Sequence, residues 1–362
     1  MEKLYSLRQF FLRLMLTVLV ASVGSVWAQS VPAPQSDKTD SATQPPTVRG
    51  NISSASLTPK IVEPSTTPSL EGSDLKPFPV ISGDVDTIDN AYTHEVTRVQ
   101  WRPGDPIDLY IVKPAGIKNP PVILYLYSYP FENDRFLNHD FCKFLVKDGY
   151  AAIGFASALT GHRYHDRPMK EWFVSELAES LATSAHDVQM ILNYLSTRGD
   201  VDMNRVGMFG DGSGAAIAIL AAAVDPRIKT LDLLDPWGDW PAWIAKSTRI
   251  PEKERPDYLK PEWLANVAPL DPIKWLPQLK TPRIRIQLIK SVTVTPQEAQ
   301  KKLEAAAPAN AQIIHYDNSP AFQQAIAGGK GFDWIKKQMA FRVIDEYSAA
   351  GQSQDKSSSS PQ

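Results

Sequence analysis

The chain has 362 residues, with 38 Lys and Arg against 40 Asp and Glu, and it contains one Cys. The formal net charge of −2 argues against a nucleic-acid-binding protein, which needs a strongly basic face. A single Cys excludes an intramolecular disulfide framework and any Cys-rich metal site. The length allows two domains, or one large domain with tails.

The first 28 residues have the pattern of a secretory signal peptide. A basic start is followed by an apolar run from Leu14 to Val26 and by Ala28, whose small side chain suits signal-peptidase cleavage. The run is shorter than the roughly 20 apolar residues that span a bilayer. We therefore predict an exported protein, periplasmic or extracellular. It would be attached to the membrane only if this segment is not cleaved.

Residues 29–90 are rich in Pro, Ser and Thr, and residues 348–362 are polar. Such segments bury too little apolar surface to offset the entropy lost on ordering. We predict a disordered spacer over 29–90, a folded domain over 91–347 and a disordered tail over 348–362.

The folded segment alternates strand and helix patterns in chain order, which is typical of an α/β protein with a mostly parallel sheet and helices on both faces. The predicted strands are residues 92–101, 107–113, 122–127, 151–156, 205–209, 228–234, 284–289 and 311–316. The predicted helices are residues 136–148, 170–196, 213–224, one after strand 284–289, and 331–347. Residues 236–279 hold a cluster of Trp and are predicted to form a cap region.

The segment Gly210-Asp211-Gly212-Ser213-Gly214 joins a predicted strand to an Ala-rich helix. It resembles the strand–turn–helix elbow of the α/β-hydrolase superfamily, in the branch of secreted bacterial esterases, dienelactone hydrolases and platelet-activating-factor acetylhydrolases. The family motif is G-x-S-x-G. The resemblance therefore implies that Gly212 stands at the nucleophile position, and Gly has no side-chain atom that can attack a carbonyl.

The resemblance also assigns the other catalytic positions. Asp235, after strand 228–234, corresponds to the family's acid, although it could equally begin the turn at Pro236. Aligning Ala321-Phe322 with the family's small–aromatic pair puts Pro320 at the position of the catalytic His. The loop after strand 122–127, where the family often has His-Gly, contains Pro130, which lacks a backbone N–H.

Ser213 is the alternative nucleophile. A Ser at the start of a helix is also a common first-turn or capping residue. An active enzyme of this kind would combine Ser213 with Asp235 and one of His162, His165 or His315. We expect His315, inside a predicted strand, to be a packed or edge residue.

Two further groups are candidates for ligand binding. His162 and His165 follow strand 151–156, at the end of the sheet where open α/β sheets bind ligands. They lack a further ligand at a suitable spacing, so we expect neither a metal nor a cofactor. Trp237 and Trp240 lie in the predicted cap, where they either stack on a ligand or build the core of the cap.

These observations lead to two hypotheses. The first is an exported α/β-hydrolase-fold protein without hydrolase activity, which binds an unidentified small molecule or protein in the former active-site crevice. The second is an active serine esterase or acyl hydrolase with the non-standard nucleophile Ser213. Neither involves nucleic acid.

Overall fold

The computed structural model describes residues 75, 81–102, 104–129, 134–160, 163, 174–327 and 332–339. The predicted signal peptide, the tail and most of the predicted spacer lie outside these residues. No helix among the described residues is both long enough and apolar enough to cross a membrane.

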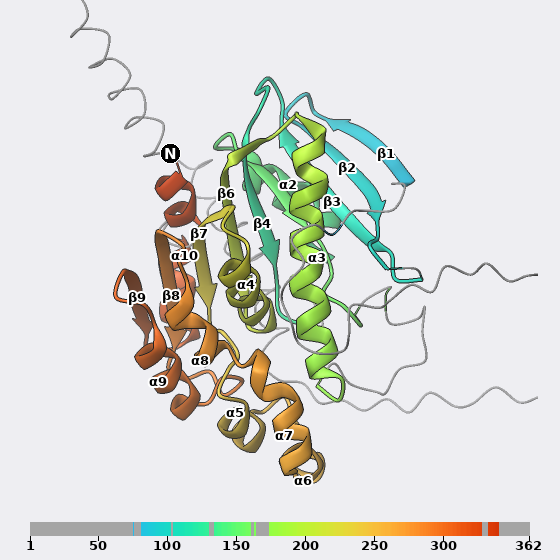
Figure 1. Cartoon of the computed structure of the whole chain (residues 1–362). Coiled ribbons are helices and arrows are strands. Elements are labelled where there is room, and N and C mark those ends of the chain that lie inside the picture. Colours follow the sequence, from blue (N-terminus) through green and yellow to red (C-terminus); the bar gives the residue numbers. More distant parts are fainter. Residues whose placement is uncertain are drawn as a thin grey trace, which may run out of the picture. The chain divides into compact units, whose positions relative to one another are not determined.

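The described strands form one sheet in the order β1-β2-β3-β5-β4-β6-β7-β8-β9 (Figure 1). The first three strands and the β3–β5 pair are antiparallel, whereas every pair from β5 through β4 to β9 is parallel. The prediction of a mostly parallel sheet is thereby confirmed. The strands are β1 (Ile81–Ile88), β2 (Tyr92–Val99), β3 (Ile107–Pro114), β4 (Pro121–Leu126), β5 (Ala151–Gly154), β6 (Asp202–Asp211), β7 (Ile228–Leu234), β8 (Arg283–Ile289) and β9 (Ala311–Tyr316).

Strand β1 corrects the start of the folded region, because it lies within the residues predicted to be spacer. It is an edge strand that pairs only with β2, and its Val85 is 59% exposed. Backbone pairing with β2 holds β1 at the edge of the sheet, and the sequence of such an edge strand carries little hydrophobic pattern.

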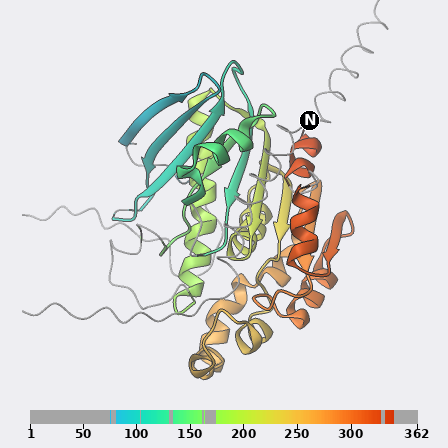
Figure 2. The same ribbon diagram turned by 180° about the vertical axis from the view of Figure 1, so that it is seen from behind.

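Helices cover both faces of the sheet, as predicted. Helices α3 and α4 lie on the face seen in Figure 1, and α2 lies on the opposite face, seen in Figure 2. Residues 333–339 are also helical, and Ile335 and Met339 pack beside Gly207 of β6. The helices outside the cap region are α2 (His139–Val146), α3 (Leu177–Arg198), α4 (Ser213–Val224), α9 (Gln297–Ala306) and α10 (Ser319–Ala327), with the short 3-10 helix η1 at Asp134–Leu137.

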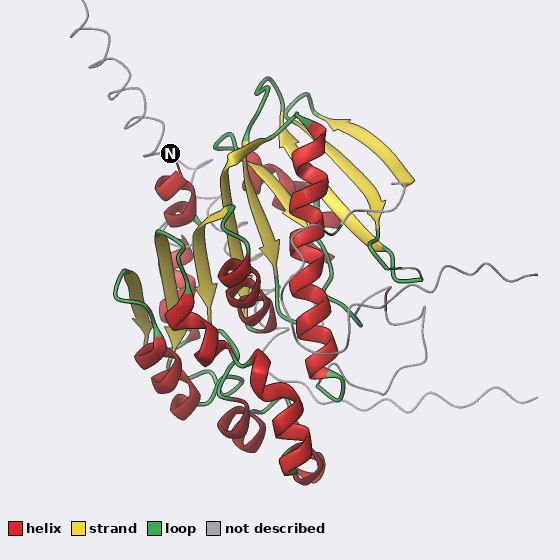
Figure 3. Cartoon of the chain, in the orientation of Figure 1, coloured by secondary structure: helices red, strands yellow, loops and turns green. Residues whose placement is uncertain are grey.

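Between β7 and β8 the chain forms short helices and loops, with no strand among these residues (Figure 3). This is the segment in which the cap region was predicted. The three Trp nearest β7 are buried there, together with several aliphatic side chains. The helices are α5 (Trp240–Lys246), η3 (Glu252–Glu254), α6 (Arg255–Tyr258), α7 (Pro261–Val267), η4 (Ala268–Leu270), α8 (Pro272–Trp275) and η5 (Leu276–Gln278).

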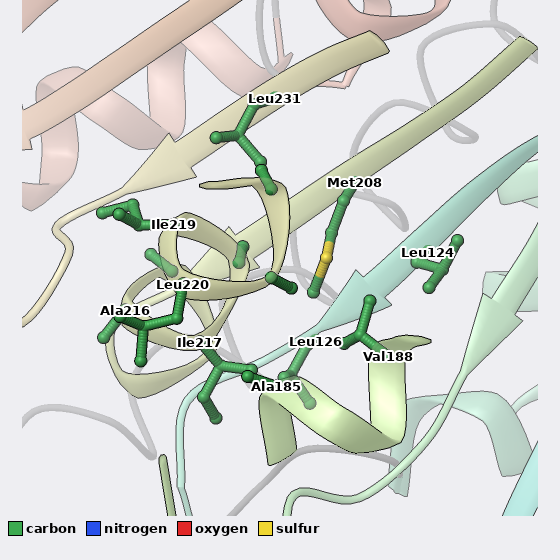
Figure 4. Packing of buried hydrophobic residues seen from close by; sticks show 14 of the residues in the cluster. Leu124, Leu126, Ala185, Val188, Met208, Ala216, Ile217, Ile219, Leu220 and Leu231 are labelled. Carbon is green, nitrogen blue, oxygen red and sulfur yellow. The ribbon is translucent and has the colours of Figure 1, made fainter. Parts of the chain in front are cut away.

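Helix α4 lies inside the core. From Ser213 to Ala222 all its residues are buried, and its side chains meet those of the sheet and of α3 (Figure 4). Met208, from β6, points toward these two helices. A helix that is apolar on all sides can be stable only when it is enclosed, and this enclosure fixes where α4 begins relative to the sheet.

Candidate functional site

The elbow between β6 and α4 consists of one residue, Gly212. Its φ is 55° and its ψ is −112°, a backbone conformation that side-chain-bearing residues rarely adopt. Its N–H donates to the carbonyl of Leu234 (2.9 Å), and its carbonyl accepts from the N–H of Trp237 (3.1 Å). The turn is therefore fixed to β7 and to the loop that follows β7.

The glycines on either side of the elbow allow the helix to approach the sheet closely. A Cβ on Gly210 would lie 2.6 Å from the Cα of Ala215, and a Cβ on Gly214 would collide with the carbonyl of Leu126 on β4. A strand–turn–helix with small residues at these two positions is the geometry that the G-x-S-x-G motif requires.

The direction in which a side chain at position 212 would project is already filled. A Cβ built there would lie 2.5 Å from the Oγ of Ser128 and 3.0 Å from the Nε1 of Trp237. Ser128 belongs to the loop after β4, and Trp237 to the loop after β7. The sequence pointed to this loop through its resemblance to the family's His-Gly loop, but it did not predict that the Ser128 side chain would approach Gly212 so closely.

Ser213, the alternative nucleophile, is the first residue of α4 and is fully buried. Its Oγ accepts a hydrogen bond from the backbone N–H of Tyr129 (2.9 Å). The side chain thus points toward the loop after β4, and it serves there as a hydrogen-bond acceptor.

Asp235 follows β7 directly and is held by three hydrogen bonds. Its Oδ1 accepts from the N–H of Ile289 (2.8 Å), its N–H donates to Gln287 (2.8 Å), and its carbonyl accepts from the Thr295 hydroxyl (3.1 Å). Burial, together with the nearby carboxyl of Asp211, raises the pKa of Asp235 to about 8, although the Ile289 N–H opposes the shift. The carboxyl group is therefore mostly protonated at neutral pH.

Asp211 is the last residue of β6 and the immediate neighbour of the elbow. Burial raises the pKa of its carboxyl, whereas the positive charges of Arg135 and Arg249 and the backbone N–H of Ser128 act in the opposite direction. Sequence analysis did not select Asp211 as a site residue. The available signal was its position between the two glycines of the motif, Gly210 and Gly212.

Pro320 is an exposed residue in the first turn of α10. The side chain of Asn318 accepts from the N–H of Ala321 (2.9 Å) and so caps this helix. His315 lies on the edge strand β9, as expected, and its ring contacts Glu304 (3.2 Å).

The other described histidines also have their partners away from the elbow. His94 contacts the carbonyl of Phe136, and His139 the hydroxyl of Tyr92, both at 3.0 Å. His186 contacts Gln189 (3.0 Å). His162 and His165 lie outside the described residues, so their proposed roles remain predictions.

Trp237 and Trp240 pack against Trp243. Their rings lie 4.5 Å and 5.9 Å from that of Trp243, and both side chains are 1% exposed. The carboxylate of Asp271 fixes the loop by accepting from the N–H groups of Asp239 and Trp240. This burial favours the interpretation that the two Trp build the core of the cap.

Among the described residues, no group of three or more His, Cys, Asp and Glu side chains is arranged to hold a metal ion. The polar groups that the described residues bring to the elbow are its backbone amides, the hydroxyls of Ser128 and Ser213, and the carboxyl groups of Asp211 and Asp235, with Arg135 and Arg249 acting on Asp211.

No protein-family model and no curated protein sequence matches this chain. Solved structures do. The chain is similar to an acetyl xylan esterase from Paenibacillus sp. R4 (15% identity, TM-score 0.58, 73% of this chain and 90% of the esterase). It is also similar to acetyl xylan esterase 1 from Thermoanaerobacterium sp. JW/SL YS485 (14%, 0.55, 66% and 81%) and to a cold-adapted esterase from an Arctic intertidal metagenomic library (13%, 0.53, 71% and 97%).

The sheet order, the elbow and these similarities together define the fold. The chain has the α/β-hydrolase fold, as the sequence predicted. At identities of 13–15% the similarity extends to the fold, and what the esterases hydrolyse says nothing by itself about this chain.

Proposed function

We propose that the protein is an exported member of the α/β-hydrolase fold that does not hydrolyse esters through a serine nucleophile and acts instead by binding a small molecule or a protein. The observation that carries this proposal is the elbow. Gly212 has the backbone geometry of a nucleophile position, but no side chain, and Ser128 and Trp237 occupy the space where one would project.

The other triad positions support the same proposal. Nucleophile, base and acid act as a unit, so losing two of them leaves little catalysis from the third. Pro320 at the expected base position has no titratable group. Asp235, at the expected acid position, has a raised pKa, and its Oδ1 accepts from the backbone N–H of Ile289 rather than from one of the described histidines.

The alternative hydrolase would use Ser213. Its Oγ is buried and already accepts the N–H of Tyr129, so an attack on a substrate would require that contact to break. A serine nucleophile also needs a base within about 3.2 Å of its Oγ. The four described histidines have other partners.

Export rests on the basic start and apolar run within residues 1–28. Cell fractionation of the full chain, beside a chain that begins after Ala28, tests it. We expect export of the first and cytoplasmic retention of the second.

The catalytic part of the proposal is tested with a fluorophosphonate probe, which labels activated serines. We expect no labelling of the full chain above a heat-denatured control, and none of its Ser213→Ala variant, with a serine hydrolase of known reactivity as the labelled standard. Labelling of the wild-type chain that disappears in Ser213→Ala would establish the alternative.

A further inference from the structure

We infer that the elbow is capped from within, so that the Ser213 hydroxyl takes the backbone N–H of Tyr129, which an acyl or carboxylate oxygen would otherwise receive. The inference rests on the proposed function, because an active acyl hydrolase needs such donors for its substrate. A capped elbow does not bind small carboxylates or acyl groups. The protein's ligand then contacts other parts of this end of the sheet.

The donors concerned are known from the chemistry of the fold. The oxyanion hole of an α/β-hydrolase is made by the N–H of the residue after the nucleophile and an N–H from the loop after the third strand of the fold. In this chain the corresponding loop follows β4 and contains Ser128, Tyr129 and Pro130.

Two of these positions offer no donor to a ligand. The N–H of Tyr129 donates to the Ser213 Oγ at 2.9 Å. Pro130 has no N–H. Ser213 directly follows Gly212, so the loop after β4 is attached to the elbow on its helical side.

The space above Gly212 is closed by the same loop and by Trp237. The backbone N–H of Trp237 donates to the Gly212 carbonyl, and the Trp237 ring lies 4.5 Å from the ring of Trp243, tilted by 34°. The side chain is 1% exposed, so this side of the elbow is packed as a core rather than as the wall of an open site.

Ser213 is therefore a positioning residue. Its hydroxyl holds the loop after β4, and it fills the place of the oxygen atom that the Tyr129 N–H would bind in an enzyme. Removing the Ser213 hydroxyl takes this internal acceptor away from the Tyr129 N–H. A small carboxylate can then bind two donors, the backbone N–H of Tyr129 and the backbone N–H of residue 213.

The matched control is Ser184→Ala. Ser184 is also fully buried, and its Oγ also accepts a backbone N–H, that of Ala158 (2.8 Å), but it lies on α3. The Ser184→Ala substitution removes the same atom and the same type of hydrogen bond as Ser213→Ala, at another place in the core.

The test follows the Tyr129 amide by NMR in the full chain labelled with ¹⁵N-tyrosine, with the resonance assigned through Tyr129→Phe. In Ser213→Ala we expect hydrogen exchange at Tyr129 to become about tenfold faster, and sodium acetate to shift its resonance saturably. In the wild type and in Ser184→Ala we expect neither effect.

A saturable acetate shift at Tyr129 in the wild type would overturn the inference, and this measurement needs no variant to fold. Unchanged exchange in Ser213→Ala, or faster exchange without an acetate shift, would overturn it as well. Fluorophosphonate labelling of the wild type, in contrast, would overturn the proposed function itself.

Discussion

The elbow and the connection between β9 and α10 lie at corresponding ends of parallel strands, and they differ in how they are held. At the elbow, Gly212 is fixed by backbone hydrogen bonds to Leu234 and Trp237, and both flanking glycines touch neighbouring backbone. The connection after β9 is exposed: the Asp317 side chain is 81% exposed and pairs with Lys290, which is itself half exposed.

This difference shows which features of the fold depend on packing and which depend on chemistry. The elbow is part of the way the core is built, because α4 can be enclosed only if it starts directly above β6. It therefore keeps its shape without a nucleophile. The β9–α10 connection contributes little to the core, so nothing in the packing preserves the position of a base there.

The first and largest effect expected from this comparison concerns Gly212→Ala. A Cβ at this position adds the backbone strain of a positive φ to a collision with Ser128. We expect the free energy of unfolding to fall by about 2–6 kcal/mol, the sum of the strain and overpacking costs. Chemical denaturation of the full chain measures it.

Gly199→Ala is the matched control. Gly199 follows α3 with a φ of 72°, and a Cβ there would meet no atom within 4 Å. In Gly199→Ala the free energy of unfolding should fall by about 1–2 kcal/mol, the cost of the backbone conformation alone. Equal losses in the two variants would mean that the space at the elbow is not filled as described.

The second effect is a dependence of stability on pH that comes from Asp235. Its pKa of about 8 in the folded state lies above its value in the unfolded chain, near 4. The folded state therefore binds this proton more tightly, and the stabilisation is complete below pH 4 and is lost as the pH rises toward 8. Asp235→Asn keeps an acceptor for Ile289 and removes the titration, so from pH 5 to pH 8 it should gain about 3–4 kcal/mol relative to the wild type.

The control for this pH series is Asp317→Asn, at the other region of the comparison. Lys290 lowers the pKa of the exposed Asp317 carboxyl, so any contribution has the opposite sign and disappears as the pH falls. A wild-type chain whose stability does not decrease between pH 5 and pH 8 relative to Asp235→Asn would contradict the raised pKa.

The two regions also differ in what the sequence could predict. Helix α4 and strand β7 have the predicted bounds, 213–224 and 228–234, because the Ala-rich helical segment is bounded by Gly212 and by the Asp225–Pro226 pair, and the strand begins shortly after that pair. Strand β1 was missed because an exposed edge strand has no such pattern. Helix α3 was predicted from residue 170 and is seen from Leu177.

The internal cap of the elbow could not be predicted from local patterns. It joins Tyr129 to Ser213, 84 residues apart in the sequence, and it depends on the direction of one hydroxyl group. The sequence identified Gly212 and Ser213 through their motif. It contained no signal that the space above Gly212 would be filled by Ser128 and Trp237.

We expect the smallest effect on stability for Pro320→His, because the connection between β9 and α10 should tolerate substitution best. This substitution restores the residue type that the fold family places in this loop. Position 320 is exposed and lies in the first turn of α10, where backbone N–H groups have no partner within the helix, so the added N–H meets water. We expect the free energy of unfolding to change by no more than about 0.5 kcal/mol.

The same variant should hydrolyse p-nitrophenyl acetate no faster than the wild type, because a base without a nucleophile leaves the acyl transfer without its first step. The Gly212→Ser/Pro320→His double variant should remain equally inactive if Ser128 and Trp237 keep the new hydroxyl from a substrate. Hydrolysis by the double variant alone would mean that only two side chains separate this elbow from a working one, and that the packing around it is adaptable. Inactivity in a double variant that stays folded would show instead that the elbow was rebuilt around the missing nucleophile.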